Sequence, residues 1–214
     1  MDFGVLTAII IGGVMGECIR HLSFSLIKNR NGQSASVLLN SRLGSFLWIL
    51  VGALGSFIIS IFIKDLITRI EYIMIFFVLL SLSAVDLSIR KIPNELIAAL
   101  LIIKIVSIVV IGDYESILPA LAGLLAGFVI FLVPSLLKIE IGWGDVKLAA
   151  ASGFCLGIMG VFQAVLIMAA VMAIYFIYLL ISKKGTLKTK VAIGPSFSIG
   201  MMLTLIFPLS MVIK

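Results

Sequence analysis

Residues 74–86 read MIFFVLLSLSAVD, an apolar run that ends in an acidic residue. Of the 214 residues, 62% are hydrophobic, whereas soluble domains contain about 45–50% apolar residues. A soluble protein of this length can bury a core without so many Leu, Ile and Val, so the excess must face lipid. The composition shows no break that would separate a second domain. The sequence therefore predicts one integral-membrane domain over residues 1–214.

Further apolar runs along the chain resemble membrane helices, which need about 20 residues to cross a hydrocarbon core of ~30 Å. They predict an all-α membrane protein, a polytopic bundle of about eight transmembrane helices. The polar stretch at residues 20–42 is expected to form a cytoplasmic loop or a short amphipathic hairpin. The predicted spans are residues 3–18, 43–63, 72–89, 94–111, 117–137, 145–157, 161–181 and 196–213.

The basic residues indicate the orientation of these spans. The net charge is +6, and Lys and Arg concentrate in cytoplasmic loops of membrane proteins. This pattern favours a lipid bilayer over nucleic acid as the partner of the basic surface. It places both termini outside a plasma (inner) membrane, with the following residues in the inner loops: Arg20, Lys28, Arg30, Arg42, Arg90, Lys91, Lys138, Lys147, Lys183, Lys184, Lys188 and Lys190.

Two acidic residues, Asp86 and Asp145, lie at the ends of predicted spans. A carboxylate at membrane depth costs roughly 2.5–3.5 kcal/mol on insertion scales, so each is a functional candidate. Two spans, 94–111 and 117–137, separate them in the sequence, so both acids should return to the same membrane face. The basic residues beside them make that face cytoplasmic.

The first acid opens the motif DLSIRKIPNEL at residues 86–96. Pro93 suits the first turn of a helix, and the residue before a proline is pushed towards an extended conformation. Asn94 and Glu95 are favourable near a helix start, where backbone amides are unsatisfied and the dipole is positive. The motif predicts a tight turn that holds Asp86 close to the next helix.

The second acid lies in IGWGDVKLAAASG at residues 141–153. Gly142 and Gly144 permit backbone conformations closed to other residues, and irregular backbone at membrane depth needs protein or a water-filled cavity to cover it. Asp145 can therefore face an extended peptide and water. Lys147 either tunes the proton of this acid or extends to the interface.

A pair of acids suits peptide hydrolysis. One ionised carboxylate acts as general base on a water, while a protonated partner donates a hydrogen bond to the scissile carbonyl. Close like charges cannot both ionise cheaply, so the two acids should titrate as a coupled pair that holds one proton.

The two motifs resemble the type IV prepilin peptidases, the A24-type aspartic proteases with a GxGD motif. The matching elements are the acid and IPNEL at residues 86–96 and GxGDVKLAAASG at 142–153, with a weaker match at Gly194 and Pro195. The resemblance covers roughly residues 72–200. It implies a GxGD intramembrane protease architecture and a catalytic dyad of Asp86 and Asp145, with no cofactor and no metal.

The resemblance also implies the substrate. Members of this family remove short basic leaders from prepilins and pilin-like secretion subunits at the cytoplasmic face, for type IV pilus assembly and protein secretion. Glu95 and Glu140 are expected contacts for such a leader. Many members carry two CxxC pairs in the loop after the first span and also N-methylate the mature pilin. The loop at 20–42 has no cysteine, which argues against zinc binding and methyltransferase activity, and Ala192 stands where the family often has proline.

Two other functions would also retain membrane acids. Presenilin-like or signal-peptide-peptidase-like proteases carry a Tyr-Asp pair and a Pro-Ala-Leu motif, whereas Val85 precedes Asp86 here and no such motif occurs. A proton-coupled transporter predicts a deep acid, often repeated in two related halves. Lys104, in the middle of a predicted span, has no partner that the sequence identifies.

Overall fold

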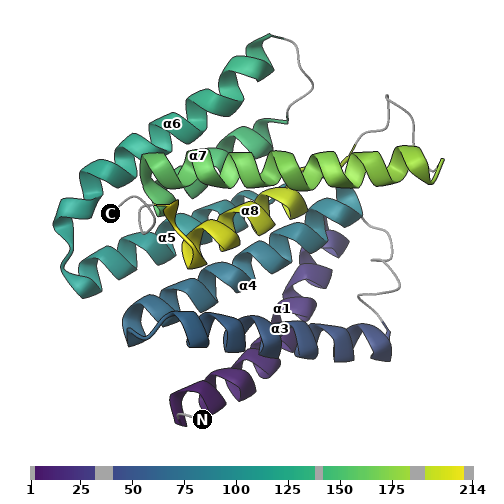
Figure 1. Cartoon of the computed structure of the whole chain (residues 1–214). Coiled ribbons are helices and arrows are strands. Elements are labelled where there is room, and N and C mark those ends of the chain that lie inside the picture. Colours follow the sequence, from purple (N-terminus) through teal and green to yellow (C-terminus); the bar gives the residue numbers. More distant parts are fainter. Residues whose placement is uncertain (1–2, 32–40, 138–141, 184–190, 210–214) are drawn as a thin grey trace. The chain divides into compact units, whose positions relative to one another are not determined.

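The computed structural model describes residues 3–31, 41–137, 142–183 and 191–209, and all regular elements in these ranges are helices. Among them, six helices are long and apolar enough to cross a membrane, and a seventh is shorter (Figure 1). The chain divides into two compact units, Met1–Tyr114 and Glu115–Lys214, called unit 1 and unit 2 below. The protein is therefore a polytopic helical membrane protein, while the single domain expected from composition stays a prediction.

Unit 1 consists of four helices. They are α1 (Phe3–Asn31), α3 (Arg42–Phe62), α4 (Leu66–Ile89) and α5 (Asn94–Ile111). Helix α1 packs against both α3 and α4, and α4 also contacts α3 and α5. Helix α4 therefore lies at the centre of the contacts within this unit.

Small residues set the approach of α1 to α3. A Cβ atom on Gly16 would collide with the backbone carbonyl of Trp48, and one on Gly52 would collide with the carbonyl of Gly12. Gly12 and Gly16 are four residues apart and so lie on one face of α1. Without a hydrophobic driving force between helices in lipid, close backbone packing of this kind holds membrane helices together.

The short connection between α3 and α4 is stabilised at its end by Asp65, the N-cap of α4. Its carboxylate accepts hydrogen bonds from the backbone N–H of Thr68, at 2.8 Å, and from the hydroxyl of the same residue, at 2.7 Å. The backbone N–H of Thr68 contributes most to lowering the pKa of Asp65 below its usual value. This side chain therefore stays ionised where the unsatisfied amides of a helix start need an acceptor.

Unit 2 contains three longer helices, α6 (Ile117–Leu136), α7 (Trp143–Ile181) and α8 (Gly194–Ile206), after the short η1 (Tyr114–Ser116). Helix α7 is interrupted at Gly157, whose φ of 71° and ψ of −179° are not helical. Its two limbs, 143–156 and 158–181, run in different directions (Figure 1).

The packing within unit 2 also depends on glycines. Gly123 of α6 and Gly153 of α7 approach so closely that a Cβ on either would collide with the carbonyl oxygen of the other. A Cβ on Gly200 of α8 would collide with the carbonyl of Ala164 on the second limb. The first limb therefore packs against α6 and the second limb packs against α8.

The α7 interruption explains how the chain differs from eight separate spans. The expected spans 145–157 and 161–181 form the two limbs of one helix, and the first limb, about 21 Å long at 1.5 Å per residue, is too short to cross ~30 Å alone. The last expected span, 196–213, corresponds to α8, which ends at Ile206. The pattern of eight apolar segments was correct, but two of them are not full-length membrane helices.

Two helix starts and ends also differ from the sequence expectation. Residues 20–31, expected in a cytoplasmic loop or a short amphipathic hairpin, continue α1 as one helix, while 32–40 lie outside the described residues. Helix α4 begins at Leu66, six residues before the expected start of its span, and thereby includes Glu71. Glu71 is buried in α4 and pairs with Lys104 of α5, and Ser23 is buried in α1 and is hydrogen-bonded to Ser81 of α4.

Candidate active site

Asp86 lies in the last turn of α4 in unit 1. Its residue is only 5% exposed, and its backbone carbonyl accepts the N–H of Arg90 at 2.8 Å. Arg90 ends the helix in a left-handed conformation, with φ of 52°. The chain therefore turns sharply just after the acid, as the motif predicted.

The next helix begins within four residues of that turn. Pro93 is the N-cap of α5, with φ of −66° and ψ of 131°, and its carbonyl accepts the N–H of Leu96 at 3.2 Å. Pro93 thus stands one position before the first turn in which it was expected. Asn94 and Glu95 open the helix and are exposed, so unit 1 brings both of them to the end of α4 that carries Asp86.

The last turns of α1 form one wall of this end of unit 1. Ile27 of α1 and Val85 of α4 are buried against each other, and the hydroxyls of Ser23 and Ser81 are hydrogen-bonded at 2.8 Å. The guanidinium of Arg30 pairs with Glu95 at 2.6 Å. The sequence analysis did not predict that this part of α1 is helical and packs against α4. The signal was present, since residues 23, 27 and 30 follow the spacing of one helical face.

Asp145 occupies the third position of α7 in unit 2 and is partly buried. Its Oδ2 accepts the backbone N–H of Gly142 at 3.2 Å, so the carboxylate turns back over the helix start. A Cβ on Gly142 would lie 3.0 Å from that oxygen. The positive end of the α7 dipole and this N–H both favour a negative charge at Asp145.

The glycines around this acid act differently from the expectation. Gly142 has φ of −71° and ψ of 144°, an extended conformation open to any residue. The positive-φ glycines of the described chain are Gly112 and Gly157, not Gly142 or Gly144. Gly142 instead leaves space for the carboxylate of Asp145. Lys147, two residues further on, is exposed.

Gly194 and Pro195 form the first turn of α8, and Gly194 is buried. Phe197, in the same turn, contacts Phe131 of α6 edge to face, with ring centroids 5.7 Å apart. Gly127 of α6 lies against the carbonyl of Ala149 on the first limb of α7. One turn further along these antiparallel helices, Phe131 is level with the start of α7. Gly194, Pro195 and Asp145 therefore lie at the same end of unit 2.

Each unit thus contributes one acid together with the motif residues around it. Unit 1 carries Asp86 with Pro93, Asn94 and Glu95, and unit 2 carries the remaining predicted site residues. Glu140 lies outside the described residues. The pairing of the two acids stays a prediction from the sequence.

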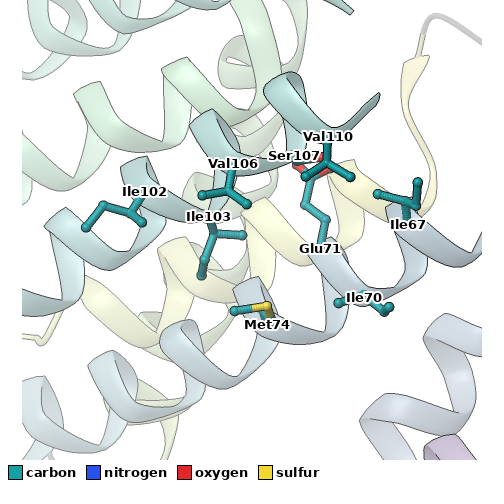
Figure 2. Close-up of a pocket in the computed structure, with 9 residues that line it drawn as sticks. All are labelled: Ile67, Ile70, Glu71, Met74, Ile102, Ile103, Val106, Ser107 and Val110. Atoms are coloured by element: carbon teal, nitrogen blue, oxygen red, sulfur yellow. The ribbon is translucent and has the colours of Figure 1, made fainter. Parts of the chain in front are cut away.

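Unit 1 also contains an ion pair that the sequence did not predict. Glu71 of α4, with a side chain 4% exposed, pairs with Lys104 of α5 at 3.1 Å and accepts the hydroxyl of Ser107 at 2.5 Å. Glu71 and Ser107 border an apolar cavity of about 280 Å³ between the two helices (Figure 2). Lys104 therefore has a partner, Glu71, which lies between two of the predicted spans.

The fold and these residues describe a membrane-embedded helical protein with an acid at a helix end in each unit. Residues 73–177, nearly half of the chain, match the model of the type IV leader peptidase family. The matched range contains both acids and the residues around them, but not Gly194 and Pro195. No curated protein and no solved structure gave a significant match. This match supports a peptidase of the leader peptidase type, in agreement with the resemblance and not with the transporter alternative.

Proposed function

We propose that this peptidase is an aspartic endopeptidase that removes the short basic leader from type IV prepilins or pilin-like secretion subunits. The family match carries this proposal because it includes both Asp86 and Asp145. In the proposal these two acids form the catalytic dyad at the cytoplasmic face of the plasma membrane, and both termini lie outside.

The environments of the two acids suggest a division of labour. Asp145 lies at the positive end of a helix dipole and accepts a backbone N–H, so it suits the role of the carboxylate that activates water. Asp86 is buried at the carboxyl end of α4, where the helix dipole is negative, so it suits the role of the acid that holds the proton.

The reaction needs only these two groups and one water. Asp145 takes a proton from the water, whose oxygen adds to the scissile carbonyl carbon, while Asp86 gives its proton to the carbonyl oxygen. In the second step the amide nitrogen takes the proton from Asp145 and the C–N bond breaks. A hydroxyl of the diol then returns its proton to Asp86, which restores the starting state of the enzyme.

The depth of Asp86 fits this substrate. Its Cα lies three residues from the end of α4, which is about 4.5 Å along the helix axis. A basic leader stays on the inner side for the same reason as basic loops do, and an apolar helix that follows it lies in the bilayer. The bond between leader and helix would then lie close to the depth of Asp86.

Co-expression with a candidate prepilin tests this function. We expect Asp86→Asn and Asp145→Asn each to lower the rate of leader removal by at least about a hundredfold, the scale of a lost acid–base group. Asp113→Asn, an exposed acid after α5, serves as the control and should retain cleavage. Full cleavage in either variant of the dyad would reject the assignment.

The same experiment reports on N-methylation, which the missing cysteines argue against. Mass spectrometry of the cleaved product should show an unmethylated N-terminus, because the chain has no cysteine-rich loop. A methylated N-terminus formed by the purified protein with a methyl donor would contradict this part of the proposal.

A further inference from the structure

We infer that Arg30 occupies, in the absence of substrate, the place on Glu95 that a basic residue of the leader takes on binding. This inference rests on the proposed function and concerns how the same site selects its substrate. It makes Glu95 a specificity-determining residue and Arg30 an internal competitor of the substrate.

The contact itself is short and accessible. Arg30 Nη2 lies 2.6 Å from Glu95 Oε2, and the side chains are 30% and 63% exposed. Exposed ion pairs contribute little to stability, so another cation can replace the guanidinium at little cost.

The surrounding charges make Glu95 distinctive. At this end of unit 1 Lys28, Arg90 and Lys91 are exposed, so a basic leader approaches a positive surface. Among the described carboxylates there, Asp86 is only 5% exposed, and in the proposed function it is a catalytic acid. Glu95 is exposed and available.

The other described acid of α1, Glu17, is already bound to neighbouring side chains. Both carboxylate oxygens of Glu17 accept hydrogen bonds from Arg20, at 2.6 and 3.0 Å, and the hydroxyl of Ser45 also donates to it. If a leader cation replaced Arg20 at Glu17, both hydrogen bonds between Arg20 and Glu17 would break. Exchange at Glu95 breaks the ion pair with Arg30, which makes Glu95 the cheaper contact for a leader cation.

The position of Glu95 also suits recognition beside the scissile bond. It lies in the first turn of α5, only nine residues after Asp86 and across the short turn that joins the two helices. The first turn of a helix stabilises a carboxylate, so Glu95 stays ionised after Arg30 leaves. A cation of the leader on Glu95 would place the adjoining peptide next to the buried acid.

A competitor and a structural tie predict opposite outcomes for the two members of this pair. Without the charge of Arg30, Glu95 is open and the KM for a basic leader should fall. Without the charge of Glu95, the leader loses its contact and KM should rise. If the pair only stabilised unit 1, both changes would impair the protein in the same direction.

The test is cleavage of a prepilin-like substrate by the full chain in detergent or liposomes, with a leader that carries Lys and Arg and a matched leader with Gln at these positions. We expect Arg30→Gln to lower KM for the basic leader about two- to fivefold and Glu95→Gln to raise it by a similar factor, the upper part of the range for an exposed charge pair. Neither change should alter KM for the Gln leader. Lys28→Gln removes the same charge from the end of α1 without a contact to Glu95, and its effect should be smaller than that of Arg30→Gln.

A charge exchange separates the two roles even if a single variant folds poorly. Arg30→Glu combined with Glu95→Arg restores an ion pair between α1 and α5, so a structural role predicts recovery of activity on the basic leader. The inference predicts no recovery and, instead, a preference for a leader with acidic residues.

Two outcomes would overturn the inference while the proposed function stands: cleavage with the same sign of change in Arg30→Gln and Glu95→Gln, or equal effects of Arg30→Gln and Lys28→Gln. If the wild-type protein cleaves no prepilin-like leader at all, the proposed function fails, and this inference fails with it.

Discussion

Glu71 and Lys104 are the residues at which a single lost charge should cost this protein most. Glu71 is almost fully enclosed between α4 and α5, and Lys104 and Ser107 supply its partners. Removal of one member of a buried ion pair leaves the other charged group unpaired, which is strongly destabilising, whereas replacement of both by apolar groups is often neutral. The pair therefore fixes the register of α4 on α5, and α4 carries Asp86.

We expect Glu71→Leu and Lys104→Met each to lower the free energy of unfolding by about 2–3 kcal/mol, less than for a fully enclosed pair because Lys104 is 21% exposed. The double variant should lie within about 1 kcal/mol of wild type. Unfolding of the purified protein by a denaturing detergent, followed by helix content, measures all three. Glu115→Gln, an exposed acid, is the control, and single variants as stable as this control would contradict the expectation.

The sequence marked Asp86 and Asp145 correctly as residues at helix ends, because a carboxylate next to an apolar run is costly and conspicuous. It could not pair Lys104 with Glu71. Glu71 comes only six residues after Asp65, and the apolar run that follows begins later, so a loop was the simpler interpretation. Burial between α4 and α5 depends on how these helices pack, which the local pattern of one helix does not determine.

Helices α1 and α7 differ most from their expected forms, for different reasons. In α1 polar residues beyond residue 20 hid a helical face that packs on α4 through Ser23 and Ile27. In α7 the sequence correctly placed a break near Gly157, because two apolar segments were too long together for one span. The backbone conformation at the break follows from glycine's freedom at positive φ.

Gly157→Ala should lower the free energy of unfolding by about 1–3 kcal/mol, because its φ of 71° and ψ of −179° belong to a region essentially restricted to glycine. A Cβ at this position would meet its nearest neighbour, the carbonyl oxygen of Pro119, only at 3.8 Å, so the cost comes from the backbone.

Gly112→Asn provides the matched control for that change. Gly112 also has positive φ, at 75°, but in the left-handed region that asparagine tolerates, and a Cβ there meets nothing within 4 Å. Thermal unfolding in detergent should show a clear loss for Gly157→Ala and little change for Gly112→Asn. Equal stability of the two variants would show that the break does not depend on the conformation of Gly157.

At the scale of the whole molecule, the family match crosses the division between the two units. Its range, 73–177, takes α5 and most of α4 from unit 1, and α6 and most of α7 from unit 2. Each unit supplies one acid, so neither unit alone carries the proposed dyad. The expectation that the acids meet came from counting spans between them, an argument about membrane faces that does not depend on how the units pack.

Cysteine replacement of both acids tests that expectation directly. In a chain with Cys18→Ser and Cys155→Ala, we expect Asp86→Cys and Asp145→Cys to form a disulfide under mild oxidation, because two side chains whose carboxyl groups share a proton point towards each other, so that small movements of the helix ends bring the Sγ atoms to bonding distance. Mass spectrometry of linked peptides, at protein concentrations low enough to exclude links between chains, measures the yield. Asp113→Cys with Asp145→Cys is the matched control, since the span count places these residues on opposite membrane faces and they should not link. Efficient linkage in the control, or its absence in the dyad pair, would mean that the two units do not bring their acids together and that Asp86 and Asp145 cannot act on one peptide bond.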